Sequence, residues 1–385
     1  MNIFSFLRRR KPIPEPWAKY YTKEELNIKI PDISMYDQVK KSAHLYPDNY
    51  AYEYMGKKCF YKDFINEINE WAKALSKSGI KHGDIVSISL PNIPNVLVVL
   101  YALNKIGAIA NMVHPLSSEE EIFQSLESTQ SKYLIMLNTF YEKVENIIKK
   151  SPVEAVIFAS AADYMPFFTK IAYNVTQIGK YKKYPKNDMF YSWKTFYKKY
   201  KTSEHIKFPK FGRDTPAVII HSGGTSGTPK NVVIQNRAFI LGALQENILM
   251  KNLHAGDCCL AIMPNFHGFG LSVLMHTPLA LGCYSILIPQ FDSKKFDIMF
   301  HKKKPSCVLG VPTLYEALMS NNNIKNLDLS NLKYIVSGGD ILPKSLEDRM
   351  NKYLKEHNSP GKITQGYGLS EALAAVCLAC DDVNK

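Results

Sequence analysis

Strands and helices alternate along most of this chain, and the alternation predicts an α/β fold with mostly parallel sheets. Short, β-branched apolar runs such as 85–90 (IVSISL) and 133–137 (YLIML) have the length and composition of buried strands. Segments with an apolar residue every three or four positions, such as 64–78, predict the intervening helices. Parallel strands need long crossovers, usually helices, so this order indicates sheets covered by helices. The length of 385 residues exceeds a typical domain, and two or more packed units are expected.

Each element follows from the local pattern. The first half of the chain predicts, in order, a helix around 35–45, a strand at 52–54, a helix at 64–78 closed by Gly79, a strand at 85–90, an apolar helix and a strand separated by Gly107 within 96–113, a helix at 119–129, a strand at 133–137, a helix at 142–150 and a strand at 155–160. The second half predicts strands at 217–220, 259–263, 284–289, 307–311 and 332–337. Asn104 and Lys105 interrupt the run 96–113, which argues against a transmembrane span there.

The segment 161–208 breaks this rhythm because lysines and aromatic residues crowd it and carboxylates are scarce. Its basic and aromatic members include Lys170, Tyr173, Lys180, Tyr181, Lys182, Lys183, Tyr184, Lys186, Phe190, Tyr191, Trp193, Lys194, Phe196, Tyr197, Lys198, Lys199, Tyr200 and Lys201. Two interpretations remain open. A basic aromatic surface suits an anionic membrane interface. Alternatively, the segment is an irregular insertion whose aromatic side chains pack inward.

Net charge and the N-terminal leader narrow the classes of partner. The formal charge of +13 favours anions in general, including nucleotides, CoA, acidic lipid and nucleic acid. No RNA- or DNA-binding motif accompanies the lysines, so we expect no nucleic-acid partner. In the basic, proline-rich leader 1–30, an apolar stretch precedes Arg8–Lys11, which is the wrong order for a secretory signal and too short to cross a bilayer. A disordered leader and a weak surface anchor remain as interpretations.

The seven cysteines predict reduced thiols and no disulfide framework. Their number is odd, they are scattered, and Cys258 and Cys259 are adjacent. Cys377 and Cys380 form one CxxC without a second pair at zinc-site spacing, so buried small hydrophobic side chains are favoured over a metal site. These features predict a cytoplasmic protein, with peripheral contact at the inner face of the membrane as a further hypothesis.

The strongest chemical motif lies within 217–233 (AVIIHSGGTSGTPKNVV), where a buried strand runs directly into a glycine-rich loop. The loop consists of Ser222, Gly223, Gly224, Thr225, Ser226, Gly227, Thr228, Pro229 and Lys230. Glycines let the backbone approach phosphate oxygens, hydroxyls and successive amides supply donors, and the lysine supplies positive charge. No Gly-Lys-Ser/Thr sequence ends the loop, so it is not a Walker A motif. The alternative is a flexible surface loop or hairpin.

The string SGGTSGTPKNV closely resembles the phosphate-loop signature of the adenylate-forming (AMP-binding) superfamily, which includes acyl-CoA synthetases. The resemblance covers roughly 35–385 and implies two stacked αβαβα-type subdomains with mostly parallel sheets, as in the large N-terminal domain of acyl-CoA synthetases. We expect the first subdomain at 31–215 and the second at 216–385. Asn231 stands where a glycine is usual, and we expect it to stiffen the loop's exit.

Three further segments resemble signatures of the same superfamily, in its order. In 264–270 (PNFHGFG), the resemblance implies that His267 lies by the acyl carboxylate and makes polar contacts there; a structural core histidine is the alternative. Segment 308–319 resembles the strand–turn–helix that lines the acyl pocket. In 332–343 the resemblance implies that the backbone of Gly338, Gly339 and Asp340 lies against adenine. The residues expected to line the acyl pocket are His267, Gly268, Phe269, Gly310 and Gly339, and the small residues Gly268, Gly270, Gly310 and Gly339 are expected to leave room for an alkyl chain.

The string 365–371 (QGYGLSE) resembles the family pattern Tyr-Gly-x-Thr-Glu, with Ser370 in place of threonine. The resemblance implies that Tyr367 stacks on adenine, that Ser370 bonds the α-phosphate and that Glu371 holds Mg²⁺. A hard cation prefers carboxylate and phosphate oxygens, which agrees with that assignment. The expected nucleotide contacts in this string are Gln365, Gly366, Tyr367, Gly368 and Ser370, and the expected catalytic set is His267, Lys230, Ser370 and Glu371.

The resemblance implies ATP-dependent activation of a carboxylic acid to an acyl-adenylate, with thioester formation on CoA. No acidic residue accompanies His267, so we expect a substrate without an α-amino group: first a medium- or long-chain fatty acid, second an aryl or short acid. The family's Tyr-x-Thr-Gly-Asp pattern, hinge and C-terminal domain are not found, so we expect a truncated form, weak or inactive alone. Alternatives are a ligase that loads a carrier protein and a non-catalytic nucleotide- or acyl-binding fragment. The sequence does not predict an oligomeric state.

Overall fold

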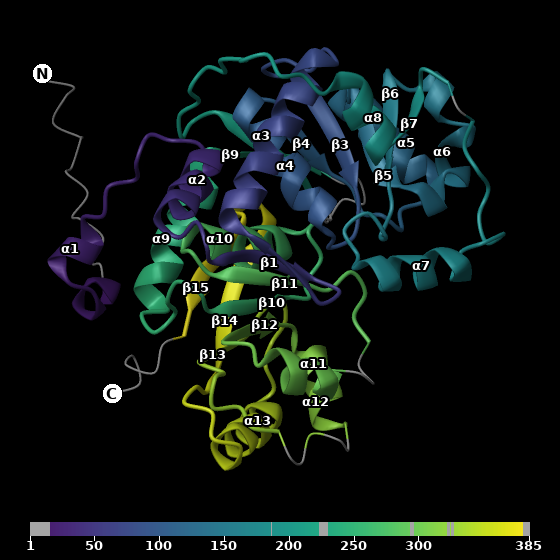
Figure 1. Cartoon of the computed structure of the whole chain (residues 1–385). Helices are drawn as coiled ribbons and strands as arrows, with labels where there is room; N and C mark the ends of the chain where they lie inside the picture. The colour runs from purple at the N-terminus through teal and green to yellow at the C-terminus, as the bar shows by residue number, and fades with distance from the viewer. Residues whose placement is uncertain are drawn as a thin grey trace, which may run out of the picture.

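The structure is a computed structural model of the chain, and it describes residues 16–185, 187–222, 230–292, 296–321, 324 and 327–379. Its strands form two sheets (Figure 1). The first sheet has the order β7-β6-β5-β3-β4-β8-β9. Its strands are β3 (Ile85–Ser89), β4 (Ile109–Met112), β5 (Tyr133–Leu137), β6 (Ala155–Ala159), β7 (Phe190–Ser192), β8 (Pro216–Ser222) and β9 (Lys230–Gln235). All neighbours in it are parallel except β8 and β9.

The second sheet has the order β15-β14-β13-β12-β10-β11-β1-β2. Its strands are β1 (Tyr50–Tyr54), β2 (Lys57–Phe60), β10 (Cys258–Ala261), β11 (Tyr284–Leu287), β12 (Cys307–Gly310), β13 (Tyr334–Ser337), β14 (Ile363–Leu369) and β15 (Ala374–Leu378). Only the outermost pairs, β1 with β2 and β14 with β15, are antiparallel. Two mostly parallel sheets with helices around them confirm the predicted fold class.

The predicted boundary between 215 and 216 does not separate the two sheets. Strand β1 pairs with β11, so an N-terminal segment completes the second sheet. Conversely, β8 pairs with β4, so the strand before the predicted phosphate loop belongs to the first sheet. Each half of the chain therefore contributes strands to both sheets.

The helices around the sheets begin and end at recognisable signals. They are α2 (Met35–Leu45), α3 (Tyr61–Lys77), α4 (Pro94–Ile106), α5 (Glu119–Thr129), α9 (Asn236–Leu249), α10 (Thr277–Ala280), α11 (Phe296–Lys303), α12 (Pro312–Met319), α13 (Lys344–Glu356) and the π-helix η5 (Phe269–His276). Ser34 caps α2, since its hydroxyl accepts from the Asp37 amide at 3.1 Å. Helix α4 starts with Pro94 and ends at Gly107, whose φ of +80° suits a left-handed cap.

Helix α4 lies in the main core, which includes residues of both sheets. Every residue of α4 except Lys105 is buried. Its polar Asn104 is satisfied there: the side-chain carbonyl accepts from the Tyr36 amide at 3.0 Å, and its amide donates to Asn236 at 2.8 Å. Burial against protein on all sides explains why this helix is apolar around its whole circumference. Within the described ranges, no helix combines the length and apolar character needed to cross a bilayer.

Two segments differ from the predicted pattern. The predicted helix 142–150 is two short pieces, α6 (Glu142–Glu145) and η4 (Ile148–Lys150). The segment 161–208 is ordered into α7 (Phe167–Thr176), β7 and α8 (Trp193–Tyr200). Its second half packs inward, because Trp193 stacks on Trp71 of α3 with ring centroids 3.7 Å apart. Helix α7 buries none of its residues and lies at the outer rim of the molecule (Figure 1).

Candidate functional site

The predicted phosphate loop connects the two strands at the edge of the first sheet. Ser222, at the end of β8, lies opposite Lys230, at the start of β9, and the Lys230 side chain is exposed. The loop residues Gly223, Gly224, Thr225, Ser226, Gly227 and Thr228 lie outside the described residues. The hairpin that the sequence left as an alternative is therefore present, with the glycine-rich loop as its connection.

A polar network connects this hairpin to β4 and α5. The His221 Nε2 lies 2.8 Å from the Asn111 side-chain oxygen and 3.2 Å from the Ser125 hydroxyl. Burial lowers the pKa of His221, so the ring is neutral at physiological pH. The Asn231 amide donates to the Ser128 hydroxyl at 3.0 Å, which ties the start of β9 to α5. This bond agrees with the predicted stiffening at Asn231.

The Ser370–Glu371 motif meets the hairpin. Strand β14 carries Gln365 to Leu369, and a 3₁₀ turn, η8 (Ser370–Ala372), follows it. This turn packs against both β8 and β9, the strands that end at Ser222 and begin at Lys230. Tyr367 is 64% exposed on the same strand. Two predicted nucleotide motifs from distant parts of the sequence therefore share one location.

The Gly338 motif lies against both neighbouring motifs. A Cβ added to Gly338 would lie 3.3 Å from the Gly366 carbonyl oxygen and 3.7 Å from the Phe269 ring. Gly339 has a φ of +79°, which disfavours any side chain there. The Asp340 side chain is exposed, and its Oδ1 accepts from the Ile341 amide at 2.7 Å. The predicted nucleotide and acyl residues thus converge around Gly338.

Two glycines that were expected to leave room for an alkyl chain have different surroundings. A Cβ on Gly270 would collide with the carbonyl oxygens of Met263 and Pro264. A Cβ on Gly310 would collide with the Leu314 side chain. Close packing of the protein itself therefore explains both glycines, and Gly270 in particular is required by its own backbone neighbours.

His267 lies in an aromatic environment that includes a second histidine. Its ring centroid is 4.6 Å from that of Phe266, and the Phe266 centroid is 4.1 Å from that of His114. Burial lowers the pKa of His267, and the nearby His114 lowers it further. Burial likewise lowers the pKa of His114, so both rings are neutral at pH 7. Sequence reasoning missed His114, although a polar residue just after the parallel strand β4 is where α/β sheets place ligands.

Asn92 and Asn265 fix the loop that carries His267. The Asn92 amide donates to the Ala261 and Met263 carbonyls, at 2.9 Å each. Its side-chain oxygen accepts from the Asn265 backbone amide at 3.1 Å and from the Asn265 side chain at 3.0 Å. Asn265 is fully buried. The end of β3 in one sheet is therefore held to the end of β10 in the other.

Comparison with known proteins agrees with this arrangement. The sequence profile of the AMP-binding enzyme family matches residues 39–385. The chain belongs to that family. It is 30% identical over 362 residues to a long-chain-fatty-acid–CoA ligase of Bacillus subtilis, with 93% of this chain and 64% of that protein covered. It is 25% identical over 370 residues to a 4-coumarate:CoA ligase of Petunia hybrida, with 91% and 61% covered.

Solved structures agree on the fold of this AMP-binding chain. A long-chain-fatty-acid–CoA ligase from Archaeoglobus fulgidus superposes with a TM-score of 0.76 at 20% identity, covering 92% of this chain and 67% of that one. The chain thus spans about two thirds of the length of these relatives. The likeness to the solved structure extends through both sheets.

The side chains around the candidate site include one predicted ligand for a cation. Among the described residues, no group of three His, Cys, Asp or Glu side chains could hold a metal by itself. Glu371 offers one exposed carboxylate on the turn that packs against the phosphate hairpin. Mg²⁺ is commonly bound by one or two carboxylates with substrate phosphates and water, so a single carboxylate here fits it. Cys377 is exposed, contrary to expectation, and Cys380 lies outside the described residues.

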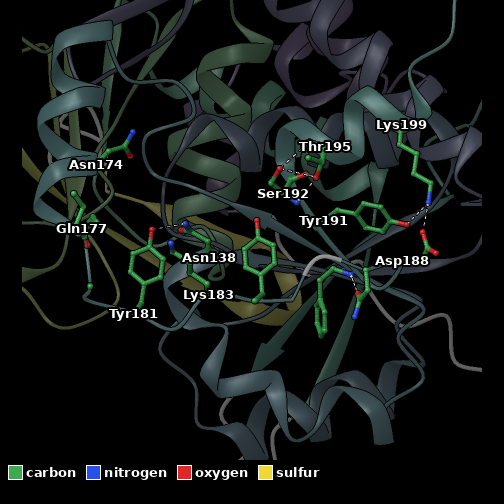
Figure 2. Close-up of a pocket in the computed structure, with 15 residues that line it drawn as sticks. Asn138, Asn174, Gln177, Tyr181, Lys183, Asp188, Tyr191, Ser192, Thr195 and Lys199 are labelled. Carbon is green, nitrogen blue, oxygen red and sulfur yellow. Dashed lines mark hydrogen bonds and ion pairs between the residues drawn. The ribbon is translucent and has the colours of Figure 1, made fainter.

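An open cavity of about 780 Å³ lies away from all of these motifs, beside α7, β7 and α8 (Figure 2). It is lined by amides, tyrosines and lysines that include Asn174, Gln177, Tyr181, Lys183 and Lys199. No residue predicted for ATP or the acyl group lines it. The residues predicted to bind ATP therefore lie elsewhere, around Gly338 and the β8–β9 hairpin.

Proposed function

We propose that this chain binds ATP with Mg²⁺ and a carboxylic acid, as part of an enzyme that forms an acyl-adenylate and then an acyl-CoA thioester. The observation that carries the proposal is the packing of the Ser370–Ala372 turn against the strands that bear Ser222 and Lys230. Hydrogen-bond donors, the Lys230 ammonium group and the Glu371 carboxylate would then surround a single binding position for a triphosphate. In the first step a substrate carboxylate oxygen bonds to the α-phosphorus, and pyrophosphate leaves with its bonding electrons.

Each predicted site residue would have a role that follows from the chemistry of its side chain. Lys230 and the Ser370 hydroxyl would stabilise negative charge that builds up on the phosphate oxygens during transfer. Glu371 would hold Mg²⁺, which supplies positive charge beside those oxygens. Tyr367, exposed on β14, offers a flat face for the adenine ring. Neutral His267 would contact the acyl carboxylate through a ring nitrogen, without carrying charge of its own.

A medium- or long-chain fatty acid is the substrate we propose. Aromatic rings and a second histidine lie around His267. The string 264–273 that carries His267 contains no acidic residue to pair with an ammonium group. The Bacillus subtilis relative is named for long-chain fatty acids, and the Petunia relative for an aryl acid. An aryl acid is therefore the second candidate. CoA is the proposed acceptor because both relatives are named as CoA ligases; a carrier-protein thiol is the alternative.

A further part of the proposal concerns location. Contact with the inner face of a membrane through the segment 161–208 would place a cytoplasmic enzyme next to a source of fatty acid. Its lysine-rich composition supports this contact with an anionic surface.

Isothermal titration of the 385-residue chain tests the nucleotide and substrate proposals together. The probes are ATP with Mg²⁺ and non-hydrolysable acyl-sulfamoyl adenosines bearing hexadecanoyl, butanoyl and benzoyl groups. We expect the hexadecanoyl probe to bind most tightly. Tightest binding of the benzoyl probe would select the aryl alternative. If the folded chain binds neither ATP nor any of these probes, the proposed function is wrong.

Matched lysine variants test the phosphate assignment. Lys230→Ala should weaken ATP binding roughly 10- to 100-fold through the loss of a charge-assisted contact worth about 1.5–3 kcal/mol. Lys230→Arg should retain part of the affinity because it keeps the charge. Lys355→Ala, which removes an exposed lysine on α13, is the control and should bind ATP like the wild type. Equal affinity for all three variants would contradict the role of Lys230.

A further inference from the structure

Helix α7 presents a row of large apolar side chains to solvent. Phe167, Phe168, Ile171 and Val175 are 71%, 83%, 48% and 62% exposed, and Ile178, just after the helix, is 78% exposed. At about 100° per residue these five positions fall within an arc of roughly 100° on one side of the helix. No other described helix or strand in the molecule exposes so many large apolar residues together.

The protein body holds α7 in place although the helix buries none of its own residues. Before the helix, the Tyr54 hydroxyl donates to the Ala161 carbonyl at 2.9 Å, and Met165 is buried. Tyr173, on the side opposite the apolar row, packs against the main core. After the helix, the Asn138 amide donates to the Tyr181 hydroxyl at 3.1 Å. Because both ends are fixed, the apolar face is a stable feature of the fold.

The charged residues of the segment that carries this face are all lysines. Between Asp163 and Asp188 the chain has five lysines and no carboxylate. Lys180 and Lys183 are exposed close to the end of the helix. Figure 2 shows Lys183 beside Tyr181, in the cavity that Asn174 and Gln177 line from the α7 side. The apolar row is therefore bordered by hydrogen-bond donors and positive charge.

We propose that α7 lies on an anionic lipid bilayer, with Phe167, Phe168, Ile171, Val175 and Ile178 buried in the interface and Lys180 and Lys183 among the headgroups. This rests on the proposed membrane contact and names the side chains that make it. An amphipathic helix with aromatic residues on one face and lysines beside them binds at the boundary of headgroups and acyl chains. A second copy of the chain fits less well, since a self-complementary contact brings the same lysines against each other.

Vesicle co-sedimentation of the whole chain tests the proposal. We expect binding to phosphatidylcholine vesicles that contain phosphatidylglycerol, weaker binding to pure phosphatidylcholine, and a decrease with added salt. Phe167→Ser/Phe168→Ser should lower the partition coefficient by roughly tenfold or more. Leu45→Ser, which removes an exposed apolar residue at the end of α2, is the control and should bind as the wild type does.

The outcomes separate the possible failures. Lys180→Glu/Lys183→Glu should reduce binding to the anionic vesicles, whereas Lys355→Glu on α13 should change it much less. Wild-type binding with no effect of either α7 double variant would overturn the assignment to α7 but keep the membrane contact. No vesicle binding by the wild type would overturn both and leave nucleotide binding untouched.

A dimer in sedimentation velocity that the Phe167→Ser/Phe168→Ser variant converts to monomer would assign the face to self-association instead. Because the four substituted side chains are exposed, the variants should melt within a few degrees of the wild type.

Discussion

The side-chain oxygen of Asn92 accepts two hydrogen bonds from Asn265, one from its backbone and one from its side chain. Asn92 lies in the loop after β3 of the first sheet, and Asn265 lies in the loop after β10 of the second sheet. The loop of Asn265 continues directly into His267. The position of the histidine therefore depends on a contact with the other sheet. This pair acts on the site by positioning, since the structure assigns neither residue to the nucleotide or acyl group.

Asn92→Ala should destabilise the protein and loosen the His267 loop. The substitution leaves the buried Asn265 amides and the carbonyls of Ala261 and Met263 without these partners, at about 1–3 kcal/mol for each group that water cannot reach. We expect the free energy of unfolding in urea to fall by about 2–4 kcal/mol. Asn66→Ala, at an exposed position of α3, should change it by less than about 0.5 kcal/mol. Equal effects of the two variants would show that the pair does not hold the sheets together.

Two glycine-to-alanine substitutions should have opposite effects. A Cβ on Gly270 would meet backbone carbonyls, which cannot move away as a side chain can, so Gly270→Ala should cost about 2 kcal/mol or more. A Cβ on Gly242, within α9, would be 3.5 Å from the Ser272 hydroxyl, an ordinary contact. Gly242→Ala should therefore stabilise by up to about 1 kcal/mol through helix propensity. Urea unfolding of both variants measures the difference, and a neutral Gly270→Ala would contradict the crowding at that position.

His267→Ala should weaken binding of the hexadecanoyl-sulfamoyl probe roughly tenfold, because a ring nitrogen no longer contacts the acyl end. The lowered pKa of His267 predicts a neutral ring from about pH 7 upward, so the wild-type affinity should stay constant between about pH 7 and pH 8.5. Titrations at three pH values check both statements. A loss of affinity across that range that disappears in the variant would mean that the charged ring binds the probe.

Glu246 should make the protein less stable as the pH rises. This residue of α9 is buried, and neither of its carboxylate oxygens has a hydrogen-bond partner within the described part of the chain. Burial raises its pKa well above the ordinary value. The folded state therefore retains a proton that the unfolded state loses above about pH 4.5, and stability falls from there toward the raised pKa.

Glu246→Gln removes this ionisation while keeping the shape of the side chain. We expect the difference in unfolding free energy between variant and wild type to grow in favour of the variant from about pH 5 to pH 8. Glu356→Gln, at an exposed position of α13, is the control. A difference that stays constant with pH would show that Glu246 ionises alike in the folded and unfolded chains.

Local patterns were sufficient for most strands and helices, because apolar spacing over five to fifteen residues determines which face is buried. These local patterns do not predict which distant strands pair with each other. Nothing in the residues around Tyr52 indicates that β1 pairs with β11, and nothing around Val218 indicates that β8 joins the first sheet. These pairings depend on contacts that only the folded chain brings together.

The candidate site likewise contains residues that the sequence predicts and residues that only the fold reveals. Lys230, His267, Ser370 and Glu371 stand in strings specific enough to be found directly, and their roles stay predictions. Asn92, His114 and His221 were missed because each is a single polar residue in an ordinary context, and only the fold brings them to these loops. The segment 161–208 shows the limit of composition: similar aromatic residues point inward at Trp193 and outward at Phe168.

Because each half of the chain contributes strands to both sheets, some strands wait for their partners during translation. Strand β1 leaves the ribosome early, yet its partner β11 is translated much later. Domains generally fold as units during translation, N-terminal first. Here the apolar Tyr50–Tyr54 strand must wait with an unpaired edge until most of the chain exists, and such edges promote aggregation. A nascent chain stalled before residue 284 should therefore bind chaperones, whereas one that has released β11 should not.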